Sequence, residues 1–142
     1  MLSLLKGLRV VDLSTIVLGP YATQFLGDFG ADVIKVESPN GGDGMRQWPP
    51  INGGYSENFA SVNRNKRSVV LDLKDPADVE RARRLVASAE VVVENFRPGV
   101  LERLGLGFAE LITLQPKLVY CSISAYGQTG PRSRQGGFDL TM

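Results

Sequence analysis

The feature that most constrains the fold of this chain is a set of five short apolar runs, separated by segments with helical patterning. Each run is dense in Val, Leu and Ile and ends at residues that favour loops, as LRVVDL does at Ser14 and Thr15. Continuous apolar runs are typical of parallel strands that are covered by helices on both faces. The predicted strands are residues 8–13, 32–36, 68–73, 91–93 and 118–123.

Helices are predicted in the intervals between these runs. Pro20 suits the first turn of a helix that ends at Gly30, while Asp75 as N-cap and Pro76 behind it open a second helix that runs to about residue 89. The first helix carries three aromatic side chains at helical spacing, Tyr21, Phe25 and Phe29. Further helices are predicted at residues 99–104 and 108–114, with another beginning at 139–142. The alternation predicts a Rossmann-like α/β fold with a largely parallel sheet.

The composition fits one globular domain and disfavours several classes of partner. The 142 residues contain 16 Lys and Arg against 15 Asp and Glu, so no overall field attracts nucleic acid or an anionic membrane. There is no histidine, which removes the commonest general base and a common metal ligand, and we expect no metal site. Residues 2–5 are too short for a signal segment, and no apolar window has membrane length, so we expect a cytoplasmic protein. Cys121 lies in an apolar run and is predicted to be buried.

Ligands of such folds bind beyond the carboxyl ends of the strands. The loops to inspect are therefore residues 14–19, 37–44, 74–75, 94–98 and 124–130. The first contains only Gly19, so the three-glycine dinucleotide fingerprint is absent and a nicotinamide or flavin site is disfavoured. Glu37 stands where a ribose-binding acid would stand, but without the glycines we interpret it as a loop or interface acid. Residues 38–55 form a long loop without periodicity, which suggests a binding or contact segment.

Two basic segments have competing interpretations. Residues 63–67, NRNKR, place three cations before a predicted strand, and by themselves they indicate a solvated edge. Lys74 stands where a strand meets a helix start, a position at which free backbone N–H groups favour an anion such as phosphate. A plain surface lysine is an equal alternative there.

The segment after the fourth predicted strand carries groups that suit a nucleotide. Phe96 could stack a purine, and Arg97 and Arg103 could bind phosphate oxygens. The alternative is core packing for the ring and salt bridges from the arginines to Glu94 and Glu102.

Six segments, taken in order, resemble one family. GLRVVDLS, LGPYATQFLGDFGADVIKVE, the GGDGMR loop, NRNKRSVVLDLK, VVVENFRPGVLERLGLG and SISAYGQTGP occur in the order and approximate spacing of the family III CoA transferases. That family includes formyl-CoA, carnitine-CoA and benzylsuccinate-CoA transferases. The resemblance extends over residues 7–139.

The resemblance implies a Rossmann-like large domain, a smaller second domain and an interlocked homodimer, with residues 1–142 forming the N-terminal part of the large domain. It implies CoA or acyl-CoA as substrate, a carboxylic acid as the second reactant and no permanently bound cofactor. Some members carry Gln at the position of Val17 and a basic residue at that of Ser38. The CoA-contacting positions of the family map onto Val17, Leu18, Ser38, Leu71, Asp72, Leu73, Lys74, Asn95, Phe96, Arg97, Arg103, Gly136, Gly137, Phe138 and Asp139.

In this family an aspartate attacks the acyl-CoA thioester and forms a mixed anhydride. The resemblance places that aspartate downstream of Met142, so we assign no catalytic residue within the chain and interpret Asp139 as a helix N-cap. The related α-methylacyl-CoA racemases use a histidine where Phe138 stands, which disfavours that alternative. A third possibility is a non-catalytic remnant that binds CoA or a partner subunit.

Overall fold

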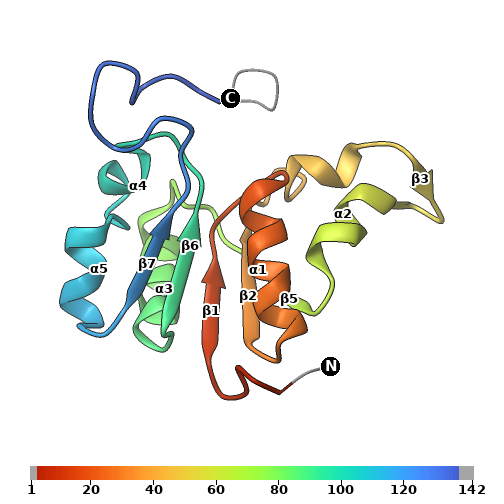
Figure 1. The fold of residues 1–142 in the computed structure, drawn as a ribbon, viewed down its shortest axis with the longest axis horizontal. Helices are drawn as coiled ribbons and strands as arrows, with labels where there is room; N and C mark the ends of the chain where they lie inside the picture. The colour runs from red at the N-terminus through yellow and green to blue at the C-terminus, as the bar shows by residue number, and fades with distance from the viewer. Residues whose placement is uncertain (1–2, 138–142) are drawn as a thin grey trace.

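A parallel sheet of five strands forms the centre of the computed structural model, which describes residues 3–137 (Figure 1). The strands are β1 (Arg9–Asp12), β2 (Asp32–Glu37), β5 (Lys66–Val70), β6 (Val91–Glu94) and β7 (Val119–Ser122). Every neighbouring pair is parallel. The predicted Rossmann-like α/β fold is therefore confirmed, with strand ends shifted by a few residues.

The order of the strands creates a crevice at the carboxyl ends of the central strands. The order is β5-β2-β1-β6-β7, so the chain builds outward from β1 on one side and then returns to the other side with β6. The loops that follow β1 and β6 consequently leave the sheet in opposite directions. Such a switch point is where open α/β sheets bind ligands.

Helices cover the two faces of the sheet: α1 (Leu18–Asp28) lies on one face, and α3 (Pro76–Ala87) and α5 (Phe108–Leu114) lie on the other (Figure 1). Successive strand residues serve opposite faces. Val10 and Val33 are register partners that pack on the α1 side, whereas Val11 and Val92 belong to the core formed with α3 and α5. All four are buried.

The helix starts follow the predicted capping chemistry. Asp75 accepts a hydrogen bond from the N–H of Ala77 at 3.0 Å, and Pro76 is the first residue of α3. Pro20 is the third residue of α1 and so lies in its first turn. These two helices begin where the sequence indicated.

The predicted helix at 99–104 is α4 (Val100–Arg103), whereas four short elements depart from the prediction: η1 (Gly44–Gln47), β3 (Ile51–Asn52), β4 (Tyr55–Ser56) and α2 (Glu57–Asn63). The predicted loop at 38–55 therefore contains a 3-10 turn and a small hairpin, and α2 was not predicted. Ser56 caps α2 by accepting the N–H of Phe59 at 3.2 Å. Elements this short carry too few apolar positions to establish a period.

One expectation about burial is wrong, that of Cys121, and the aromatic side chains of α1 do not face the core. The aromatic side chains of Tyr21 and Phe25 are exposed, because α1 turns its small and polar residues, such as Gly19 and Thr23, towards the sheet. Cys121 is also exposed rather than buried. It lies on the edge strand β7, which β6 separates from β1, whereas α1 covers β1 and β2 (Figure 1).

Candidate functional site

Three adjoining clefts lie along the side of the sheet that the carboxyl ends of its strands form. Their volumes are about 280, 330 and 390 Å³. Phe96 lines both the first and the second cleft, while Leu73, Lys74 and Leu104 line both the second and the third. The shared residues make the three clefts one elongated surface.

The first cleft lies at the switch point between β1 and β6. Asn95, Phe96 and Arg97 follow β6 directly and face Leu18 at the start of α1. The guanidinium of Arg97 lies beside Gly136: a Cβ atom built onto Gly136 would lie 3.6 Å from Arg97 Nη2. Within residues 3–137 this guanidinium forms no ion pair, so its charge is available to a ligand.

The second cleft has an apolar floor and a polar rim. The floor consists of Leu13, Val36, Leu71, Phe96, Val100 and Leu104. Ser38, Asp72 and Lys74 supply part of the rim. The Asp72 carboxylate accepts the N–H of Lys74 at 3.0 Å and thereby fixes the turn that precedes α3. Such a surface suits a ligand with an apolar section and polar ends.

The third cleft gathers cations. Lys74 and Arg103 line it and form no ion pair with any residue of the described chain. Arg83 lines it as well, donating through Nη1 to the carbonyl of Gly105 at 2.9 Å, with Nε at 3.7 Å from Glu80. Three positive side chains around one cleft suit phosphate groups. Sequence reasoning missed Arg83, because nothing in the arginine-rich pattern of α3 indicates which cation faces the strand ends.

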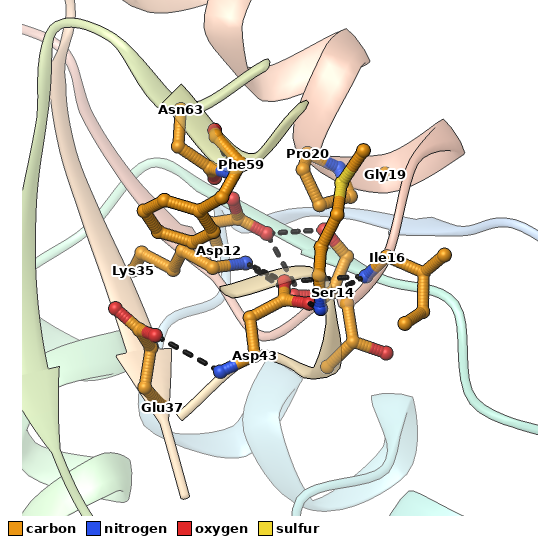
Figure 2. Close-up of polar contacts among 12 residues, drawn as sticks. Asp12, Ser14, Ile16, Gly19, Pro20, Lys35, Glu37, Asp43, Phe59 and Asn63 are labelled. Carbon is orange, nitrogen blue, oxygen red and sulfur yellow. Dashed lines mark hydrogen bonds and ion pairs between the residues drawn. The ribbon is translucent and has the colours of Figure 1, made fainter. Parts of the chain in front are cut away.

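A buried ion pair lies behind the loop that follows β1 (Figure 2). Lys35 and Asp43 are 1% exposed, and Lys35 Nζ lies 2.9 Å from Asp43 Oδ2. The same ammonium donates to the carbonyl of Ser14 at 2.8 Å. Asp43 accepts the N–H groups of Ile16 and Met45. A charge pair at this depth is stable only with this degree of hydrogen bonding.

A second buried pair corrects the interpretation of NRNKR as a solvated edge. The side chain of Lys66 is 2% exposed, and its Nζ lies 3.0 Å from Asp12 Oδ2 while donating to the carbonyl of Pro20 at 2.7 Å. Burial lowers the pKa of Lys66 to about 8, although the Asp12 carboxylate acts in the opposite direction. Its neighbours Arg64 and Arg67 do lie at the surface. The charge pattern alone does not reveal which cation points inward.

Glu37, the last residue of β2, is a structural acid that holds the loop after this strand. Its carboxylate accepts two hydrogen bonds from Arg46, at 2.6 and 2.7 Å, and one each from the Ser68 hydroxyl and the Asp43 N–H. Burial by itself would raise the pKa of Glu37, but these donors, Arg46 foremost, hold it at about 2. The Arg46 guanidinium also lies 3.8 Å from the centre of the Phe59 ring. All these groups serve to fix the loop.

The structure brings together most of the residues expected to contact CoA. Those that line the clefts are Leu18, Ser38, Leu71, Asp72, Leu73, Lys74, Asn95, Phe96, Arg97, Arg103, Gly136 and Gly137. Val17 lines none of the three clefts and lies at the N-cap of α1. Phe138 and Asp139 lie outside the described residues.

Other kinds of site have no counterpart in the described part of the chain. Residues 3–137 contain no group of three or more His, Cys, Asp or Glu side chains placed to hold a metal ion. Over the same residues, no helix combines the length and apolarity needed to cross a membrane.

A parallel sheet with a ligand-sized crevice at its switch point, flanked by cations that form no ion pair within residues 3–137, defines an α/β protein of the Rossmann-like class. Comparison with known proteins makes the assignment specific. Residues 5–142 match CoA-transferase family III, and the chain belongs to that family.

Relatives with sequence and structure similarity support the same assignment. Succinyl-CoA:glutarate CoA-transferase from Mus musculus is 48% identical over 136 residues, which cover 95% of this chain and 31% of the relative. Succinate--glutarate CoA-transferase from Agrobacterium fabrum is 47% identical over 145 residues, covering 97% and 36%. A CAIB/BAIF family protein from Brucella suis superposes with a TM-score of 0.93 at 44% identity, covering 99% and 38%. The chain thus spans about a third of the length of these relatives.

Proposed function

We propose that this chain supplies the CoA-binding loops of a CoA transferase that moves CoA from an acyl-CoA donor to a carboxylic acid acceptor. In this proposal, residues 1–142 form the N-terminal part of the large domain, and the complete protein is a homodimer. The observation that carries the proposal is the elongated surface of three clefts, with an apolar floor and with cations at Lys74, Arg97 and Arg103 that form no ion pair within residues 3–137. CoA has the matching chemistry, because it joins a phosphate-bearing nucleotide to a long, weakly polar arm.

The clefts differ in the part of CoA that they suit. The cations around the third cleft, Lys74, Arg83 and Arg103, suit phosphate oxygens, and the apolar floor of the second suits the pantetheine arm. Phe96 stands between the first two clefts with a half-buried ring. Arg97, in the first cleft, offers a further charge to a phosphate or to a carboxylate substrate.

The reaction itself requires a carboxylate nucleophile, which we place outside this chain. That carboxylate attacks the thioester carbonyl carbon, the C–S bond breaks, and CoA leaves as the thiolate. The acceptor carboxylate then attacks the acyl group of the mixed anhydride and forms a second anhydride, which restores the enzyme carboxylate temporarily. The enzyme carboxylate attacks the acceptor's acyl carbon in this second anhydride and releases the first acid. The CoA thiolate then attacks the acceptor's acyl carbon in the enzyme anhydride, which gives the new thioester and frees the enzyme carboxylate.

Calorimetric titration of the chain with CoA tests the binding role. We expect Arg97→Gln and Arg103→Gln each to weaken CoA binding about fivefold, the value of one exposed charge-assisted contact. Arg84→Gln is the matched control, because Arg84 is an exposed cation on α3 that lines none of the three clefts. Equal effects of all three substitutions, or no binding of CoA by the unmodified chain at millimolar concentration, would contradict the proposed role.

A further inference from the structure

The loop between β1 and α1 is held in a high-energy backbone conformation. Ile16 has a φ of 68°, in the left-handed region that β-branched residues strongly disfavour. A residue held there persists only when its surroundings impose the conformation. Val17 and Leu18, two of the residues expected to contact CoA, follow Ile16 directly.

Three consecutive N–H groups of this loop are each taken by a side-chain oxygen. The N–H of Ser14 donates to Asp12 Oδ1 at 2.9 Å, and that of Thr15 donates to Asn95 Oδ1 at 2.9 Å. The N–H of Ile16 is shared by the two Asp43 oxygens at 3.1 and 3.2 Å (Figure 2). The acceptors come from the end of β1, from the loop after β6 and from the loop after β2.

Asn95 holds the loop through both ends of its amide. Its Oδ1 accepts the N–H of Thr15, and its Nδ2 donates to the carbonyl of Thr15 at 2.9 Å. The first turn of α1 packs against this arrangement: a Cβ added at Gly19 would overlap the Ser14 side chain and stand 3.6 Å from Asn95 Cγ. The amide is thus directed at the loop, although Asn95 also borders the first cleft.

We propose that Asn95 and Asp43 are positioning residues, which hold Thr15 and Ile16 so that the start of α1 faces acyl-CoA. The proposal rests on the proposed function, since it assumes that the first cleft receives CoA. In it, the side chain of Asn95 acts on the loop rather than on the ligand. Arg97, two residues further along, differs because its guanidinium forms no ion pair within residues 3–137 and is free to act on the ligand.

The test measures the loop and the ligand separately. A left-handed residue gives a strong nuclear Overhauser effect between its own Hα and H–N, so labelled chain reports the conformation of Ile16 directly. We expect Asn95→Ala to lose this signature and to weaken CoA binding about tenfold, as the competent loop conformation becomes a minor population. We expect Arg97→Ala to weaken CoA binding without changing the Ile16 signature.

A second substitution separates positioning from direct contact. Glycine adopts the left-handed conformation without steric cost, so Ile16→Gly added to Asn95→Ala should restore part of the CoA affinity. It should not do so when added to Arg97→Ala. If Asn95→Ala does not fold, Asn95→Asp keeps the shape but replaces the donor to the Thr15 carbonyl with a charged oxygen that repels it, and the same two measurements apply.

The outcomes distinguish this proposal from the proposed function. Loss of CoA affinity in Asn95→Ala with an unchanged Ile16 signature, or without rescue by Ile16→Gly, would overturn the positioning role and make Asn95 a direct ligand. Absence of CoA binding by the unmodified chain would instead count against the proposed function. In that case the Ile16 signature in Asn95→Ala still decides whether Asn95 holds the loop.

Discussion

At the scale of single residues, buried carboxylates determine the shape of the loops around the candidate site. Asp12, Glu37 and Asp43 lie at or just beyond strand ends, are at most 4% exposed and accept several hydrogen bonds each. None of them lies free to react with a ligand. Their contribution is to fix the backbone from which exposed residues such as Arg97 reach the cleft.

Glu37 gives the fold a specific dependence on acid. Because its pKa is about 2 in the folded chain and ordinarily 4.5, the unfolded state takes up the proton first as pH falls. The stability that its ionised form provides, about 3 kcal/mol, is therefore complete above pH 4.5 and is lost as pH falls towards 2.

Urea unfolding at several pH values measures this contribution. Glu37→Gln should be less stable than the unmodified chain at pH 7, and the difference in free energy of unfolding should shrink as pH falls from about 5 to 2. Other carboxyl groups titrate in both proteins and cancel in the difference. A difference that stayed constant over this range would show that ionisation of Glu37 does not stabilise the fold.

Lys66 should matter far more to stability than its neighbour Arg67. Lys66→Met leaves the buried carboxylate of Asp12 without its cation, and we expect a loss of about 3–5 kcal/mol. Arg67→Met is the matched control, because Arg67 is 65% exposed and pairs with Asp32 at the surface, an interaction that contributes about 1 kcal/mol or less. Chemical denaturation monitored by circular dichroism measures both losses. Similar losses for the two variants would contradict the assigned role of the buried pair.

These residues also mark a limit of sequence reasoning. That Arg97, Lys74 and Arg103 line clefts beyond the strand ends could be predicted, because a strand end followed by a cation is visible in the sequence. Lys66 and Asp43 could not, since their partners are 54 and 8 residues away in the chain. Only the packing of β5 beside β2 and the return of the loop after β2 bring each charge to its partner.

At the scale of elements, the start of α1 depends on a close approach that only glycine permits. Gly→Ala within a helix ordinarily stabilises by about 1 kcal/mol. At Gly19 the added Cβ would overlap the side chain of Ser14, which is itself buried and bonded to Asp12. We therefore expect Gly19→Ala to destabilise the chain by about 2–3 kcal/mol instead.

The exposed residue Ala22 of the same helix provides the control for this prediction. Ala22→Gly should cost about 1 kcal/mol through helix propensity alone. Thermal unfolding of both variants gives the comparison. If Gly19→Ala raised the melting temperature, the close packing of α1 on the loop after β1 would be refuted.

The elements themselves differ in how far the sequence predicts them. The strands and α3 could be predicted because apolar runs, Asp75 and Pro76 act locally. The hairpin of β3 with β4 could not, because each strand has only two residues in a segment rich in Gly, Pro and Asn, and the helix α2 follows that segment without an apolar repeat that marks its start. Burial was misjudged where an element lies at an edge, as for Cys121 on β7.

At the scale of the whole molecule, the strand order explains why separate motifs form one surface. β1 and β6 are neighbours although some 80 residues separate them, so the loops that carry Thr15 and Asn95 meet at the switch point. Parallel pairing places the carboxyl ends of all five strands on the same side of the sheet. The alternating pattern of strands and helices predicts that the strand ends lie together, but the distances between their side chains, and which cations form ion pairs within residues 3–137, follow only from the folded chain.

The face of the sheet beside α1 is less completely covered than the opposite face. Val119 on β7 is 59% exposed, Cys121 of the same strand is exposed, and the paired rings of Tyr21 and Phe25 on α1 are also exposed. Tyr120 of β7 points to the other face, into the core formed with α3 and α5. Apolar area of this kind on an isolated chain favours association.

We therefore expect residues 1–142, studied as a separate chain, to self-associate with a dissociation constant of about 100 µM or tighter. Sedimentation velocity over a range of concentrations measures this directly, and maleimide labelling of Cys121 should slow as association covers β7. Val119→Lys should restore the monomer, because a charge on the contact face opposes its burial. Leu4→Lys is the control, since Leu4 is 76% exposed and precedes the start of β1 at Arg9. A monomer at all concentrations, with a constant labelling rate, would mean that this face does not drive association.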